Sequence, residues 1–353
     1  MDSGRKKRVC VLGAGVIGLS TAVRILEDQL QDRGGTSPGQ VEVTVVADRF
    51  SPHTTSDGSG GFWEPYNLGD TPQQSIRKWS DATWEHLHQL ATCPDTAAAV
   101  GAQFVSGYTL CDTHTVQDPS FRDRVLGYRY LTAQELRLFP FARWGYFHTT
   151  LQINVKSYLP WLMKRFKSLG GRTEVKTVDN LSEVAEEYDV VVNSCGPRAG
   201  ALMSDPHTLP IRGQTRRIRA PWVKHFYICD SSDGNICYVL PLGDIVVVGG
   251  TAQRGNAKEE VDAADSEELW SRATTLFPII KNGEKVSEWA GLRPGRTSVR
   301  LETEIVKTKT KSLPVIHNYG HGGAGVTLHW GCAAEAANLV HRALLTPAAH
   351  SRL

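Results

Sequence analysis

The chain has 353 residues, of which 41% are hydrophobic and 22% are charged. This length exceeds what one hydrophobic core usually organises, so we expect two domains, and the composition is typical of a globular protein rather than a disordered or fibrous one. The 39 basic and 37 acidic residues give a formal net charge of +2, which provides no electrostatic reason to expect a nucleic-acid partner.

The seven cysteines are widely spaced and form no C-x-x-C pair or cysteine–histidine set at metal-ligand spacing. We therefore predict a reducing compartment and no metal site. No uninterrupted apolar stretch is long enough to cross a membrane, and the first residues lack the apolar region of a signal peptide. We expect no membrane partner.

The first elements predict a β-α-β unit. Arg8 to Leu12 is rich in β-forming residues, the glycine turn Gly13 to Gly18 follows, and apolar residues then recur at helical spacing as far as Leu26. A second β-branched run, Val41 to Ala47, ends at Asp48.

This turn has the spacing G-x-G-x-x-G between a strand and a helix, which is typical of dinucleotide binding. Glycines at these positions allow a tight turn, close approach of a pyrophosphate and close packing of helix on sheet, and the helix N-terminus favours the anion. Asp48 stands where a carboxylate accepts hydrogen bonds from the adenosine ribose. The motif leaves FAD and NAD open, since both carry these groups.

The middle of the chain begins with a glycine-rich loop, Thr54 to Gly61, of the kind that approaches a ligand. Lys78 to Leu90 and Tyr158 to Leu169 have helical apolar spacing and are interpreted as packing elements. Asp189 to Asn193 is an apolar strand of the parallel-sheet kind, which we place in the first sheet.

Arg212 to Gln253 indicates antiparallel β structure, with a hairpin whose turn is Leu242 to Asp244. The last elements are a strand at Leu313 to Asn318, a second glycine turn at Gly320 to Gly325, and a helix at Val326 to Leu345. Backbone N–H groups and a helix N-terminus at this second turn suit a flavin, which becomes negatively charged on reduction, and so favour FAD over NAD.

These elements predict an α/β fold in which a Rossmann-like FAD-binding domain is interleaved with an α+β substrate domain built on a mainly antiparallel sheet. We assign residues 1–60, 148–200 and 290–353 to the first domain, and residues 61–147 and 201–289 to the second.

Five blocks in order resemble the D-amino-acid oxidase and D-aspartate oxidase family: VLGAGVIGLSTA, ADRFSPHTTSD, RGQ with APWVKHF, GLRPGRTSVRLE and HNYGHGGAGVTLHWGCAAEAA. The resemblance covers nearly the full length. It implies that a D-amino acid passes a hydride from Cα to flavin N5, and that oxygen re-oxidises the flavin to give hydrogen peroxide.

By the same resemblance, Arg293 binds the substrate carboxylate with its planar guanidinium, and Tyr238 adds a hydrogen bond to that carboxylate. The Gly323 carbonyl receives the substrate amine. We expect no obligatory base, because a neutral amine needs none for hydride transfer. His321 is interpreted as structural or close to the flavin. The expected FAD-binding residues are Gly13, Gly15, Val16, Ile17, Gly18, Asp48, Arg49, Thr54, Thr55, Ser56, Gly60, Gly61, Val178, Ser194, Gly196, Gly320, Gly322, Gly323, Ala324, Gly325, Val326 and Thr327.

The expected side-chain pocket contains Trp63, Glu64 and Ala252. Glu64 replaces the amide or apolar residue usual in D-amino-acid oxidases, and it either favours cationic substrates or is paired within the protein. Ala252 replaces the arginine with which D-aspartate oxidases hold a second carboxylate, although Arg254 or Arg216 is an alternative source of that charge. The segment Tyr227 to Cys237 should cover the active site and is shorter than the lid of mammalian D-amino-acid oxidases.

The predicted activity is FAD-dependent oxidative deamination of neutral or basic D-amino acids, giving a 2-oxo acid, ammonia and hydrogen peroxide. D-aspartate oxidase is the same-fold alternative; a flavin-binding module without turnover and an NAD-dependent dehydrogenase are alternatives of other kinds. Ser351-Arg352-Leu353 matches the C-terminal peroxisomal address, so we expect binding to the peroxisomal import receptor. A homodimer is a further candidate assembly.

Overall fold

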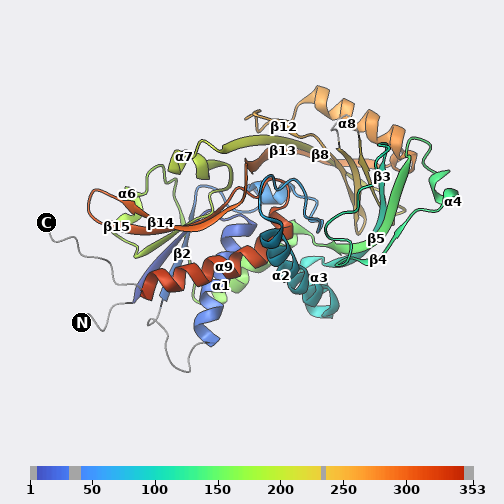
Figure 1. The fold of residues 1–353 in the computed structure, drawn as a ribbon. Coiled ribbons are helices and arrows are strands. Elements are labelled where there is room, and N and C mark those ends of the chain that lie inside the picture. The colour runs from blue at the N-terminus through green and yellow to red at the C-terminus, as the bar shows by residue number, and fades with distance from the viewer. Residues whose placement is uncertain (1–5, 32–40, 232–235, 346–353) are drawn as a thin grey trace.

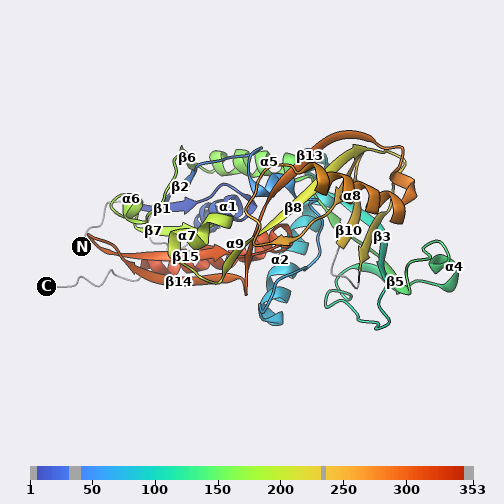
Figure 2. The same ribbon diagram turned by 90° about the horizontal axis from the view of Figure 1, so that it is seen from above.

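The computed structural model describes residues 6–31, 41–231 and 236–345. Two β-sheets lie side by side, and the long strands β8 (Thr208–Arg219) and β13 (Glu284–Arg296) reach from the second sheet toward the first (Figure 1). The view from above shows the same division, with α1 and α9 on one side and α8 on the other (Figure 2).

The first sheet is mostly parallel, with β14 as an antiparallel edge strand. Successive residues of its inner strands are buried on opposite faces: Val9 and Val11 pack into one apolar cluster, and Cys10 and Leu12 into another. In spatial order, its strands in the described part of the chain are β14 (Arg300–Lys307), β15 (Ser312–Tyr319), β7 (Val190–Asn193), β1 (Lys7–Leu12), β2 (Val41–Ala47) and β6 (Arg172–Val175).

Helices cover both faces of this sheet. The helices α1 (Val16–Gln31), α5 (Val155–Ser168) and α9 (Gly325–Leu345) pack on one face, and the short α6 (Ser182–Ala185) and α7 (Ala199–Met203) lie with the other cluster. The helix α2 (Gln73–Thr92) packs against α9, where the Thr83 hydroxyl accepts the Trp330 N–H at 3.2 Å. The remaining helices are α3 (Pro94–Val100), α4 (Ala133–Leu136) and α8 (Ala263–Leu276), with 3-10 turns at Thr55–Gly58, Gly196–Arg198 and Pro278–Ile280.

The second sheet is mainly antiparallel, and its two faces differ. One face packs against α8 through Ile218, Val239 and Leu269, while the other carries Ile228 and Leu240 and faces the first sheet. Besides β8 and β13, its strands in the described residues are β3 (Gln103–Cys111), β4 (Leu126–Tyr130), β5 (Trp144–Gln152), β9 (Phe226–Asp230), β10 (Ile236–Leu242), β11 (Ile245–Gly249) and β12 (Gln253–Arg254).

This arrangement confirms the predicted fold class, including the hairpin of β10 and β11, whose turn has Gly243 at a φ of +63°. The strand β5 runs to Gln152 and β13 to Arg296, so both extend a few residues past the predicted domain boundaries at 148 and 290. The helix α2 was assigned to the substrate domain, but it packs on the cofactor side because Trp84 and Leu87 complete the core beneath α9.

Candidate active site

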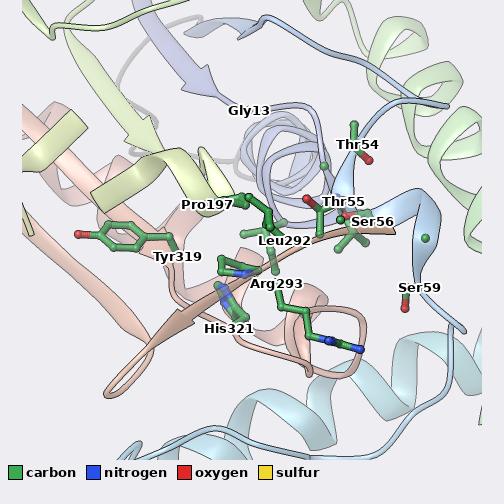
Figure 3. A pocket seen from close by; sticks show the side chains of 18 of the residues that line it. Gly13, Thr54, Thr55, Ser56, Ser59, Pro197, Leu292, Arg293, Tyr319 and His321 are labelled. Carbon is green, nitrogen blue, oxygen red and sulfur yellow. Dashed lines mark hydrogen bonds between the residues drawn. The ribbon is translucent and has the colours of Figure 1, made fainter. Parts of the chain in front are cut away.

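A cavity of about 670 Å³ lies between the two sheets and is lined by both. In Figure 3, Gly13, Thr55 and Ser56 gather on one side of this cavity, while the Arg293 guanidinium points to another. Its volume is in the range of cofactor and ligand sites. The cavity therefore has the size and the two-sided lining of a joint site for a cofactor and a substrate.

The first glycine turn folds as the motif predicts. Gly13 has a φ of +103°, and a Cβ there would lie 2.3 Å from the Ser194 carbonyl oxygen. A Cβ on Gly18 would lie 2.0 Å from the Gly13 carbonyl oxygen, so this glycine permits close packing rather than lining the cavity. The N-terminus of α1 therefore opens onto the cavity and offers its field to an anion.

The loop after β2 is fixed against this turn. The Ser56 hydroxyl accepts the Val16 N–H at 3.0 Å. The buried Asp57 carboxylate accepts hydrogen bonds from the Thr54 N–H and hydroxyl at 2.9 and 2.7 Å, which holds the 3-10 turn in place. Thr54, Thr55 and Ser56 thereby line the cavity beside the N-terminus of α1.

The second glycine turn lies on the cavity next to β13. Gly320 and Gly322 have φ values of +86° and +53°, and the Gly322 N–H donates to the Pro294 carbonyl at 2.9 Å. The turn leads into α9, which begins at Gly325. Gly322, Gly323, Gly325 and Val326 therefore border the cavity at a helix N-terminus, as expected for a group that gains negative charge.

Four lining residues carry buried polar atoms without a hydrogen-bond partner in the described residues: Ser194 Oγ, Thr215 Oγ1, Asn318 Oδ1 and His321 Nε2. Burial lowers the pKa of His321 to about 3, with a further contribution from the neighbouring His329, so its imidazole is neutral. Unsatisfied polar atoms of this kind are rare in proteins, and a polar ligand would satisfy them. The cavity thus fits a large group with hydrogen-bonding atoms along its length.

Away from the first glycine turn, the cavity is lined by Arg293 and Tyr238. The stretch of β13 from Trp289 to Pro294 lines the cavity, and Arg293 Nη1 donates to the Thr251 carbonyl at 2.8 Å. Burial raises the pKa of Tyr238, outweighing the opposing charge of Arg293 and the hydrogen bond to it. The phenol is therefore a neutral donor beside a cation, which is a suitable pair for binding a carboxylate.

Two glycines leave the space that the side chains of Arg293 and Tyr238 occupy. A Cβ on Gly213 would lie 2.3 Å from Arg293 Nη1, and a Cβ on Gly249 would lie 2.1 Å from the Tyr238 ring. Gly213 lies within the RGQ block of the family resemblance, but neither glycine was predicted to have a role. The sequence held one indication of this role: a glycine inside a β strand often marks the close approach of another group.

Glu64 is a carboxyl group at the same side of the cavity. Its backbone is fixed by Thr327, whose hydroxyl accepts the Glu64 N–H at 3.1 Å. Burial, together with the charge of Asp230, raises the pKa of the Glu64 carboxyl to about 7. No hydrogen bond or ion pair engages this carboxyl in the described part of the chain, so the interpretation that it is paired within the protein is not supported.

Most of the predicted site residues line the cavity, including Ala252, Val178, Gly60 and Gly196. Trp63 does not: alternation turns it away from Phe62 and Glu64, and its indole packs on Trp84 and donates to the Ser80 carbonyl at 3.2 Å. It belongs to the core and is a correction to the predicted pocket. Also outside the lining are Gly18, Gly61, Gly320, Ala324 and Thr327, which act through packing, backbone geometry or support of Glu64.

The alternative cations do not reach the pocket. Arg216 points to the α8 side of β8, where it pairs with Glu288 at 3.0 Å and stacks on Trp270. Arg254 is exposed on β12, next to Ile211 in register, and does not line the cavity. Residues 232–235 of the predicted cover and the C-terminal tripeptide lie outside the described residues.

Comparisons with known proteins agree with this geometry. The model of the FAD dependent oxidoreductase family matches residues 8–339. D-aspartate oxidase of Homo sapiens is 40% identical over 350 residues, covering 98% of this chain and 99% of its own. D-amino-acid oxidase of Rubrobacter xylanophilus is 36% identical over 337 residues, covering 96% and 97%. Glycine oxidase of Geobacillus kaustophilus shares the fold with a TM-score of 0.71 at 19% identity, covering 96% of this chain and 95% of its own.

The fold and the cavity thus define an FAD-dependent oxidoreductase. The chain belongs to the family of D-amino-acid and D-aspartate oxidases and is an FAD-dependent oxidase acting on D-amino acids. The cofactor is therefore FAD and not NAD, the two alternatives that the first glycine motif left open. Within the described ranges, no helix is long and apolar enough to cross a membrane, and no group of three or more metal-ligating side chains occurs.

Proposed function

We propose that this protein oxidises D-amino acids with neutral or basic side chains in preference to acidic ones, giving a 2-oxo acid, ammonia and hydrogen peroxide. The observation that carries the proposal is the charge of the substrate pocket. Arg293 stands beside Tyr238, whereas the side-chain region holds Glu64 in the field of Asp230.

Arg293 and Tyr238 bind the α-carboxylate and so fix one end of the substrate. Gly323 carries no Cβ, which would lie 3.1 Å from the Tyr66 ring, and so leaves that narrow space for the amine at the second glycine turn. These contacts orient the Cα–H bond, and such orientation is the main contribution that the protein makes to the rate. When bound, FAD would supply the acceptor for the hydride and the route for two electrons to oxygen.

The substrate side chain then extends along Ile228 and Leu240 toward Glu64. A second carboxylate on the substrate would be repelled by the like charge of Glu64 and Asp230. Among the described residues no cation offsets this repulsion, because Ala252 stands where D-aspartate oxidases carry an arginine. The other lining cations, Arg49, Lys176 and Arg198, lie around Asp48 at the far end of the described cavity. Acidic substrates should therefore bind weakly.

D-aspartate oxidation is the second candidate, favoured by the 40% identity to the human D-aspartate oxidase. One experiment separates the two: oxygen uptake and peroxide release by the holoenzyme with D-alanine, D-arginine and D-aspartate, and with the L-forms as controls. We expect a higher kcat/KM for D-alanine and D-arginine than for D-aspartate. A higher kcat/KM for D-aspartate would reject the proposal in favour of the second candidate.

A further inference from the structure

Five charged side chains of alternating sign form a chain of contacts at the Asp48 end of the cavity. Arg49 Nη1 and Nη2 contact Glu259 Oε2 and Oε1 at 2.6 and 3.4 Å, and Arg49 Nε lies 3.6 Å from Asp48 Oδ2. Arg198 continues the chain, with Nη1 at 3.0 Å from the same Asp48 oxygen and Nη2 at 2.7 Å from Asp179 Oδ1. All five residues line the cavity, and we call them the charged chain.

The members of the charged chain come from both halves of the molecule. Asp48 and Arg49 follow β2 of the first sheet, whereas Glu259 follows β12 of the second. The pair of Arg49 and Glu259 joins residues 210 positions apart and connects the two walls of the cavity. Without the contact between Arg49 and Glu259, the segment after β12 would lose this ion pair with the first sheet.

Arg198 also determines how Asp48 presents its carboxylate. Oδ2 is occupied by Arg198 and by the more distant Arg49, while no described residue donates a hydrogen bond to Oδ1. A guanidinium held on one oxygen limits the rotation of the carboxylate. The remaining oxygen is thus available to the ribose hydroxyls, a role that the strand-end position already indicates for Asp48.

We propose that Arg198 and Glu259 are cofactor-positioning residues: Arg198 orients Asp48 toward the adenosine ribose, and Glu259, through Arg49, closes the segment after β12 over that end of FAD. Both act through another residue rather than on the reacting atoms. The proposal concerns retention of FAD and does not depend on substrate preference.

The expected size of the effect follows from exposure. Arg49 and Glu259 are 49% and 46% exposed, so their pair is partly screened by solvent. Exposed pairs contribute modestly, and losing one should speed FAD release by roughly two- to fivefold. The difference should shrink at high salt, because surface pairs are screened within a few ångströms at about 1 M ionic strength.

The test measures the rate of FAD release from diluted holoenzyme, from the rise in flavin fluorescence, at low and high KCl. The variants are Arg198→Gln and Glu259→Gln, with Arg172→Gln as a matched control that removes the exposed pair with Glu42 away from the cavity. We expect faster release in both site variants at low salt, a smaller difference at high salt, and an unchanged rate in the control.

Arg198→Lys keeps the charge but not the fork that contacts two carboxylates, so it should give an intermediate rate. Circular dichroism of each apoprotein checks that the variants are folded. A wild-type release rate in either folded Gln variant would overturn the proposal, as would a salt-independent acceleration.

Discussion

The ionisation of Glu64 should control the preference for basic substrates, and pH is the most direct way to change it. Burial and the charge of Asp230 raise its pKa to about 7. The carboxylate attracts a cationic side chain, whereas the neutral acid does not. With that pKa, about one-tenth of the groups are ionised at pH 6 and about nine-tenths at pH 8. The ratio of kcat/KM for D-arginine to that for D-alanine should therefore rise roughly tenfold between these values.

The ratio is informative because both substrates share the α-amine and α-carboxylate, so the titration of those groups and of Tyr238 cancels. Tyr66 and Asp230 are other titratable groups near Glu64, and the variant Glu64→Gln retains both of them. Any pH dependence that they cause would therefore persist in this variant. In that variant the ratio should be low and nearly constant with pH. Steady-state oxygen uptake at saturating FAD measures both values. A wild-type ratio that is flat between about pH 6 and 8, or a rise that persists in Glu64→Gln, would refute the reasoning.

Three further predictions follow from the same site. Arg293→Leu should lower kcat/KM for D-alanine by ~30-fold or more, because an unpaired substrate carboxylate costs roughly 2–5 kcal/mol, and wild-type kinetics in this variant would remove Arg293 from the substrate site. Ala252→Arg should raise kcat/KM for D-aspartate several-fold, whereas Ala257→Arg, at the Glu259 side of the same cavity, should not; equal gains would show a non-specific charge effect. A fluorescent fusion ending in Ser351-Arg352-Leu353 should enter peroxisomes, and entry of a fusion without these three residues would disprove this address.

The cofactor half of the site could be predicted from the sequence because its elements are local. A strand, a glycine turn and a helix stand in direct succession from Arg8 to Leu26, and Asp48 ends the next β-branched run. Each of these signals depends on neighbouring residues, and their spacing carries over directly into the structure.

The substrate half depends on contacts between distant segments, and local patterns were weaker there. The strand β13 was not predicted as a strand because Gly291, Pro294 and Gly295 disfavour one. These residues are tolerated because β13 is an edge strand that pairs only with β8 among the described strands. Arg293 was therefore identified through family resemblance and not through periodicity.

The other differences concern Trp63 and three charged residues. Trp63 was assigned to the pocket with its neighbour Glu64, although extended backbone sends adjacent side chains to opposite sides. Arg198, Asp230 and Glu259 gave no signal as isolated charges, because their significance arises only when the two sheets bring them to the same cavity.

The hydrogen bond from the Gly322 N–H to the Pro294 carbonyl has a consequence for how the enzyme could change during evolution. It connects the second glycine turn to the residue directly after Arg293, so in the proposed binding mode the groups that align substrate and flavin are joined by one backbone contact. Glu64, Ile228 and Ala252 come from other segments of the chain. Substitutions there can alter which side chain is accepted while the alignment of Cα with the flavin is preserved, so new specificities are accessible without rebuilding the chemistry.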